Sequence, residues 1–159
     1  MRKRIVGSGP TPGESGTGPW LDLEALAVAE VTSEDPEHPV EGALVAGDGR
    51  GWRAAQPGPQ TLRLVFDRPQ QLGRVRVVCE EPERERTQEL FLGWAPKPDD
   101  EPRQIVRQQW NFNAGARREV EELTVDLSGV GMLELYLVPE IGGGEGVASV
   151  TELRLGPRE

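Results

Sequence analysis

Hydrophobic and polar residues alternate one by one along much of this 159-residue chain. In one such stretch Leu62, Leu64 and Phe66 fall on one face of a strand. Thr61 and Arg63 fall on the other face. The stretches with this alternation are residues 26–32, 60–66, 74–80, 86–94, 104–112, 119–127, 132–138 and 148–155. Successive side chains of a strand point to opposite sides of a sheet, so the pattern predicts eight strands, each with one apolar face.

The fold class follows from these strands and from the lack of a helical pattern. The first predicted strand places Leu26 and Val28 on its apolar face, and a short turn near residues 40–45 is the best helical candidate. The 20 glycines and 14 prolines favour short elements joined by turns. We therefore expect an all-β domain, an eight-stranded jelly-roll β-sandwich with its core between two sheets.

The amino-terminal region has a different composition. Residues 7–19 are Gly, Pro, Ser and Thr, with Glu14 as the only charged residue, so they have no apolar face to bury. We predict a flexible arm over residues 1–19 and a single sandwich domain over residues 20–159. The basic start, Arg2 to Arg4, is interpreted as solubilising.

Charge and cysteine content narrow the partners and the compartment. The formal net charge is −9, so most of the surface would repel a nucleic acid. Cys79 is the only cysteine, which excludes an internal disulfide, and its place in an apolar alternation predicts a core position. No apolar run suits a signal peptide or a membrane span. We expect a cytoplasmic protein without a membrane partner.

The residues show no enzyme signature. His38 is the only histidine and lies between Glu37 and Pro39 in a polar segment, where it is interpreted as a surface residue. There is no Cys/His cluster for zinc and no glycine-rich phosphate loop between a strand and a helix. The chain is therefore predicted to have no active site of its own.

Four tryptophans are candidates for stacking against a sugar ring. Trp94 and Trp110 share strand faces with aliphatic residues and are predicted to be core. Trp52 lies in a glycine-rich segment and Trp20 follows the arm, so both are ligand-binding candidates. The alternative is that Trp52 packs beneath the loops and that Trp20 fastens the arm to the domain.

Two strands carry arginine and glutamine, whose planar ends bind hydroxyls and carboxylates in pairs. Arg107 and Gln109 alternate with apolar Trp110 and are predicted to face outward, which makes them ligand-binding candidates. Arg86 and Gln88 share the inward face of their strand, so we expect them to form a structural network at the end of the sheet. The alternative for the outward pair is a solvent-facing sheet with cross-strand ion pairs.

A series of short motifs then occurs in a fixed order. The motifs are VTSE (31–34), EGAL (41–44), GDG (47–49), GWR (51–53), FDRP (66–69) and ASVTEL (148–153). The series resembles the discoidin-like, or galactose-binding-like, β-sandwich superfamily, which includes coagulation-factor type C domains and many carbohydrate-binding modules. The resemblance runs from about Leu26 to Leu155 and implies a galactose-binding-like jelly roll that binds a carbohydrate or another polar ligand.

The same resemblance implies a metal site. In many carbohydrate-binding members a structural calcium joins the loop after the first strand to an acid in the last strand, and Asp48 and Glu152 stand at the matching places. The alternative is that Asp48 shapes a glycine-flanked turn and that Glu152 is a surface acid. No other cofactor is expected.

Two further functions stay open. Exposed edge strands and an acidic surface would serve a protein–protein interaction module of a larger assembly. Residues 51–55, followed by Gly58 and the strand 61–66, resemble the amino-terminal domain of the eukaryotic single-strand-break repair scaffold, which contacts DNA and a repair polymerase. The negative charge makes this nucleic-acid function the third choice.

Overall fold

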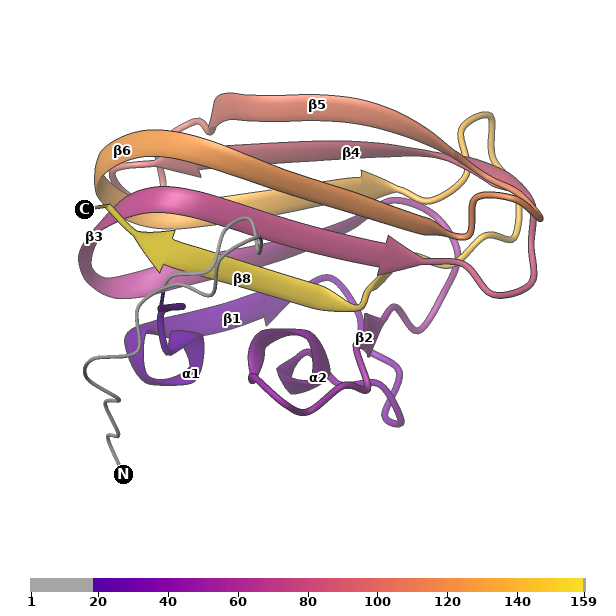
Figure 1. Ribbon diagram of the computed structural model, residues 1–159, viewed down its shortest axis with the longest axis horizontal. Coiled ribbons are helices and arrows are strands. Elements are labelled where there is room, and N and C mark those ends of the chain that lie inside the picture. Colours follow the sequence, from indigo (N-terminus) through magenta and orange to yellow (C-terminus); the bar gives the residue numbers. More distant parts are fainter. Residues whose placement is uncertain (1–18, 159) are drawn as a thin grey trace, which may run out of the picture.

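The computed structural model describes residues 19–158 as antiparallel strands with two four-residue helical turns (Figure 1). The elements are, in chain order, α1 (Leu23–Leu26), β1 (Ala27–Val31), α2 (Glu41–Leu44), β2 (Trp52–Arg53), β3 (Gln60–Glu80), β4 (Arg86–Ala95), β5 (Arg103–Phe112), β6 (Arg118–Val138), β7 (Ser149–Val150) and β8 (Glu152–Pro157). This content confirms the all-β prediction. The predicted arm, apart from residue 19, lies outside the described residues.

Two long strands build both layers of the sandwich. β3 and β6 have 21 residues each, and their pairing shifts register between Val65 and Arg74. Pro69, which has no N–H for the ladder, lies at the bend of β3, and Gly129 (φ 69°) lies at the bend of β6. The predicted strands 60–66 and 74–80 are thus the two halves of β3. In the same way, 119–127 and 132–138 are the two halves of β6.

The pairings define the two layers. A five-stranded layer has the order β1–β3–β6–β4–β5 and uses the first half of β3 and the second half of β6. A three-stranded layer has the order β8–β3–β6 and uses the other halves. In Figure 1, β5 is the upper edge of the first layer, and β8 lies beside β3. The short pair β2–β7 is separate.

The core lies between these layers. Buried apolar residues from both layers form one cluster, which includes Leu62, Leu64, Leu90, Leu92, Leu133 and Leu135 from the five-stranded layer and Val75, Val77, Leu153 and Leu155 from the other. Each such side chain contributes about 1.5–3 kcal/mol when fully buried. Cys79 belongs to this core as predicted, and its burial raises the pKa of the thiol to about 12, so the thiol is unreactive at neutral pH.

The first strand differs from the prediction. Val28 is 58% exposed, and the partly buried positions are Ala27, Ala29 and Val31. The Asp22 carboxylate accepts a hydrogen bond from Ala25 N at 3.2 Å and caps the helical turn α1, which takes Leu26 out of the strand. The alternation therefore starts one residue later than the sequence pattern indicates.

The long segment between β1 and β3 contains α2, within the predicted turn at residues 40–45. A Cβ at Gly42 would lie 2.4 Å from the carbonyl oxygen of Gly51, so only glycine allows this close approach. The buried Arg154 donates to the carbonyl of Ala43 at 2.7 Å and joins α2 to β8. No helix among residues 19–158 is long and apolar enough to cross a membrane.

Candidate functional site

The outward side of the five-stranded layer carries one continuous row of side chains. Tyr136 on β6 is paired with Thr61 on β3 and with Phe91 on β4. Phe91 is paired in turn with Arg107 on β5. Beyond Thr61, the hydroxyl of Thr32 accepts a hydrogen bond from Thr61 N at 2.8 Å. The row thus begins at Thr32, directly after β1, and continues across β3, β6 and β4 to β5. We call its residues the tyrosine row: Thr32, Thr61, Tyr136, Phe91 and Arg107.

The sequence places this row outward because its neighbours point inward. On β6, Leu135 and Leu137 are buried, so Tyr136 between them is only half-buried. On β4, Leu90 and Leu92 are buried and Phe91 is half-buried for the same reason. The row is therefore held on strands whose opposite face is the core, which fixes the side chains in place.

A glycine lets the Phe91 ring lie against the sheet. A Cβ at Gly93 would lie 2.7 Å from Cε1 of Phe91, so the ring occupies the space above this glycine. The guanidinium of Arg107 lies 5.1 Å from the centre of the same ring, within the range of a cation–π contact. Phe91 is thus a support for Arg107, and Tyr136 is the neighbouring ring that Arg107 does not cover.

Two glutamates, one on each side of the tyrosine row, form ion pairs with arginines. Arg107 donates to Glu89, and Gln109 lies opposite Glu89 in the pairing of β4 and β5. Arg63 donates to Glu134 at 2.7 Å on the other side of the row. Such surface pairs contribute little to stability, typically below about 1 kcal/mol. Their effect is to hold planar hydrogen-bonding groups in defined orientations.

A shallow hollow opens at one end of the row. Its volume is about 310 Å³, and its lining residues are Glu30, Val31, Thr32, Thr61, Arg63 and Glu134. The carbonyl of Pro98, in the loop between β4 and β5, accepts a hydrogen bond from Arg63 at 3.5 Å, so this loop borders the same region. The hollow and the aromatic pair are therefore parts of one surface.

Two of the predicted binding residues lie on this surface. Arg107 has a side chain that is 52% exposed, and Gln109 is exposed on the same outward side of β5. The predicted outward face is confirmed, while a role in binding stays a prediction. The sequence alone did not identify three other residues of this surface as binding candidates: Arg63, Phe91 and Tyr136. Each lies between two inward-facing leucines, so the alternation did indicate that its side chain points outward.

The two tryptophan candidates lie elsewhere. Trp52 is only 1% exposed, and its indole N–H donates to the carbonyl of Ser33 at 3.1 Å, so it presents no open ring to a sugar. Trp20 is half-buried, and the guanidinium of Arg74 lies 3.7 Å from its ring centre. The burial of Trp52 matches the alternative that it packs beneath the loops. Whether Trp20 fastens the arm stays a prediction, because residues 1–18 lie outside the described part of the chain. Trp94 and Trp110 pack against the core, partly buried.

Asp48 and Glu152 each face arginines. Asp48 accepts two hydrogen bonds from the Arg50 guanidinium at 2.8 Å, which lowers the pKa of the Asp48 carboxyl to about 2. Glu152 lies 3.6 Å from Arg154 and 3.9 Å from Arg76. Within residues 19–158, no group of three His, Cys, Asp or Glu side chains could hold a metal ion. Both carboxylates therefore have arginine partners in this structure, and the calcium hypothesis stays a prediction.

A buried polar network occupies the end of the sandwich that lies away from the C-terminus. Arg86, whose side chain is fully buried, donates to Glu81 at 2.7 Å, to the carbonyl of Pro139 at 2.6 Å and to Gln88 at 2.9 Å. Gln88 donates to Glu119 at 3.2 Å. The prediction of an inward structural network around Arg86 and Gln88 is thus confirmed.

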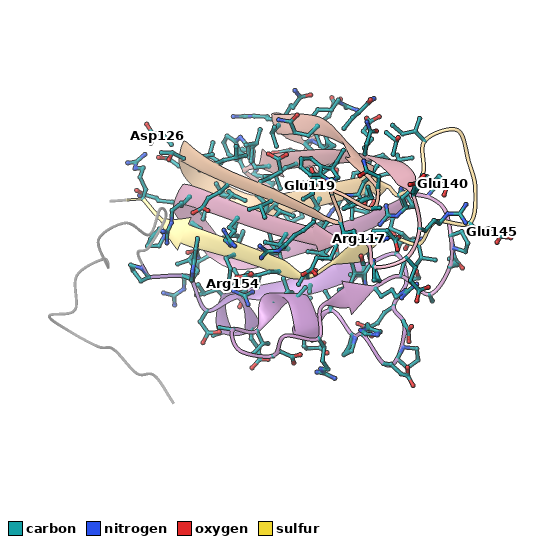
Figure 2. The ribbon with its side chains drawn as sticks, turned by 45° about the vertical axis from the view of Figure 1, so that its right-hand side comes forward. Arg117, Glu119, Asp126, Glu140, Glu145 and Arg154 are labelled. Atoms are coloured by element: carbon teal, nitrogen blue, oxygen red, sulfur yellow. The ribbon has the colours of Figure 1, made fainter. Side chains whose placement is uncertain are left out.

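The loops around this network are joined by further contacts. Arg84 makes two hydrogen bonds with Glu140, at 2.6 and 3.0 Å, and Arg117 donates to the carbonyl of Pro82 at 2.7 Å. In Figure 2, Glu140 and Glu145 lie at this loop end, whereas Asp126 lies at the opposite end of the molecule. Gly146 lies directly against the Arg86 side chain, since a Cβ there would be 3.0 Å from Arg86 Cδ.

Glu119 has the most perturbed carboxyl group in the network. Burial, followed by repulsion from the nearby Glu121, raises the pKa of Glu119 to about 7. Among the described residues, three buried side-chain polar atoms lack a hydrogen-bond partner: Nη2 of Arg86, Nε1 of Trp110 and Oε2 of Glu119. Arg86 and Glu119 belong to the network, and Trp110 is paired in register with Gln88 of the network. The sequence also indicated the inward position of Glu119. It lies four residues before Leu123, and residues an even number of positions apart share one face of a strand.

Comparisons with known proteins give matches in structure only, since no protein-family model and no curated protein sequence matches the chain. The family 32 carbohydrate-binding module of C. perfringens NanJ, in complex with galactose, has a TM-score of 0.64 at 14% identity and covers 86% of this chain and 96% of its own. The module of the same family in AlyQ, in complex with 4,5-unsaturated mannuronic acid, has a TM-score of 0.63 at 11% identity, with coverages of 87% and 98%.

A third match is part of a larger chain. The GH29 fucosidase of Ruminococcus gnavus, in complex with fucose, has a TM-score of 0.67 at 9% identity, and the match covers 87% of this chain but 27% of the fucosidase. At these identities the likeness concerns architecture. It agrees with the two-layered antiparallel β-sandwich described above. The fold of this chain is the galactose-binding-like, or discoidin-like, β-sandwich.

Proposed function

We propose that this chain is a non-catalytic module that binds carbohydrate on the outward side of its five-stranded layer. The observation that carries the proposal is the tyrosine row: Tyr136 lies beside Phe91, and paired arginines and glutamates lie on both sides of the two rings. The apolar face of a sugar ring packs on an aromatic ring, while planar polar groups bind its hydroxyls.

The solved structures support the ligand class. Two of the similar domains are carbohydrate-binding modules in complex with sugars, and each of these modules is matched over nearly its own whole length. A binding function without catalysis also suits the state of the two side chains most able to react. Cys79 is fully buried, and Nδ1 of His38 lies 3.2 Å from the carbonyl oxygen of Arg50.

The test is a glycan array followed by isothermal titration with the best glycan. Tyr136→Ala should weaken binding about tenfold or more, because it removes the central ring of the row. Val120→Ala, an exposed position on the first half of β6, is the matched control and should bind like the native chain. Equal binding by both variants would exclude the tyrosine row as the site, and salt-sensitive DNA binding in place of glycan binding would favour a nucleic-acid function.

A second candidate function rests on the edge of the same layer. β5 pairs with β4 on one side, has ten residues and contains no lysine or proline of the kind that usually blocks an edge strand. A partner protein could add a strand there. Its binding should be lost in Gln108→Pro and retained in Tyr136→Ala, whereas a sugar ligand should show the reverse dependence on Tyr136.

A further inference from the structure

We infer that the ligand of this surface is a linear, uncharged oligosaccharide that lies across the strands, and not a single terminal sugar. This inference rests on the proposed function and goes further, because it assigns the length, direction and charge of the ligand. Three features of the outward side carry it: the length of the tyrosine row, the position of the hollow and the pairing of the charges.

The first feature is length. The tyrosine row runs from Thr32, the residue that directly follows β1, to Arg107 on β5 and therefore crosses four strand spacings, about 19 Å in total. One pyranose ring is about as wide as one such spacing. A single sugar on Tyr136 would reach the neighbouring strands only, whereas a chain of three or four sugars would span the row.

The second feature is the division of binding groups between the two ends. Arg107, Phe91 and Gln109 lie at the β4–β5 end. The hollow of about 310 Å³, with Thr32, Thr61, Arg63 and Glu134 in its wall, lies at the β1–β3 end. Tyr136 stands between the two ends, since it is paired with both Thr61 and Phe91. A ligand that uses both ends must pass over Tyr136.

The third feature is charge. Arg107 in the row is paired with Glu89, and Arg63 beside the row is paired with Glu134. Glu30 adds a further carboxylate to the wall of the hollow. An acidic sugar would have to compete with these carboxylates for the arginines and would be repelled by Glu30. A neutral sugar, in contrast, can exchange hydrogen bonds with these arginine–glutamate pairs without separating them, and the pairs already hold their groups in defined orientations.

The experiment measures affinity against ligand length. The probes are β-1,4-linked galactan, cellulose, xylan and mannan oligosaccharides of one to six units, with mannuronate oligosaccharides as the charged series, and the method is isothermal titration with the full chain. For at least one neutral series we expect affinity to rise about tenfold or more from one to four units and then to level off. The mannuronate series should bind more weakly at every length.

Variants at the two ends of the row map the direction of the ligand. Arg63→Ala and Arg107→Ala should each weaken binding of the tetrasaccharide about tenfold, while a disaccharide, which cannot reach both ends, should respond to one of them at most. Tyr136→Ala should weaken binding at every length. Val120→Ala is the control, and thermal unfolding of each variant shows that it is folded.

The outcomes separate this inference from the proposed function. If a monosaccharide binds as tightly as the tetrasaccharide and Tyr136→Ala abolishes both, the surface binds sugar but the extended ligand is wrong. If mannuronate oligosaccharides bind more tightly than the neutral series, only the inference that the ligand is uncharged is wrong. If no sugar of any length binds, or if binding depends on Arg84→Ala at the loop end and not on Tyr136, the proposed site itself is wrong.

Discussion

Two Arg-x-Gln segments on neighbouring strands have opposite environments. Arg86 and Gln88 on β4 point into the sandwich, and the Arg86 side chain has no exposed surface. Arg107 and Gln109 on β5 point outward, and the Arg107 side chain is 52% exposed. The two segments are almost side by side, since Gln88 is paired with Trp110. The difference arises from the parity of each residue within its strand.

The comparison shows how the same chemical groups take different roles. Inside the sandwich, Nε and Nη1 of Arg86 donate to protein partners and join β4 to Glu81 and to the carbonyl of Pro139, while Nη2 has no hydrogen-bond partner. Outside, Arg107 needs no fixed set of partners because water reaches it. Its contacts with Glu89 and with the ring of Phe91 orient it without burying it. The first arginine supports the fold, and the second is available to a ligand.

The largest expected effect is that of Arg86→Ala. It removes the cation from a buried pair and leaves Glu81 and Gln88 without their partner, so we expect a loss of about 3–5 kcal/mol in the free energy of unfolding. Urea denaturation of the native and variant chains measures it. A loss below about 0.5 kcal/mol would show that Arg86 is not part of a structural network.

Gly93→Ala should have a smaller effect, confined to the outward side. The new Cβ would lie 2.7 Å from the Phe91 ring and 3.1 Å from the carbonyl oxygen of Arg103, so the ring must move off the sheet. We expect a loss of about 1–3 kcal/mol and weaker glycan binding. Gly115→Ala is the control, because its Cβ would meet nothing closer than 3.6 Å. Equal stability of the two variants would contradict the position of the Phe91 ring directly above Gly93.

Glu119, in the buried network around Arg86, should make the free energy of unfolding depend on pH. Its pKa in the folded chain is raised to about 7 from an ordinary value near 4.5. The folded state therefore holds a proton that the unfolded state releases, and the contribution is present at low pH and is lost as pH rises through 7. The groups around it are Glu121, Arg86, Gln88 and Cys79.

The measurement compares native and Glu119→Gln chains by denaturation at several pH values. Relative to the variant, the native chain should lose about 1–3 kcal/mol of stability between pH 4.5 and 7. Glu122→Gln, at a partly exposed carboxylate paired with Arg76, is the control and should not remove this loss. Parallel pH curves for native and Glu119→Gln chains would show that Glu119 titrates normally.

The smallest effect on stability is expected for Arg107→Ala. An exposed ion pair and a cation–π contact of this kind are each worth at most about 1 kcal/mol, and water replaces the lost contacts, so the free energy of unfolding should change by about 0.5 kcal/mol or less. Glycan binding should nevertheless weaken. If Arg107→Ala destabilises the chain as much as Arg86→Ala does, the contrast between the two sides of the layer fails.

The sequence by itself determined the strands and most of their faces. The one-by-one alternation placed Leu62, Val77 and Leu135 in the core and sent Arg107 and Gln109 outward, because a strand has no other way to arrange successive side chains. It also predicted that Arg86 and Gln88 point inward. It failed at Val28, where a capped turn shifted the phase of the strand by one residue.

Only the tertiary structure decided which residues from distant strands meet. The alternation gives the direction of Tyr136 but not its neighbours, and register alone sets it between Thr61 and Phe91, 75 and 45 positions earlier in the chain. Likewise, Trp52 and Asp48 occur in a motif that suits a binding loop, but Trp52 packs in the core and Asp48 binds Arg50. A local pattern fixes the direction of a side chain, whereas its partners depend on long-range pairing that no local pattern contains.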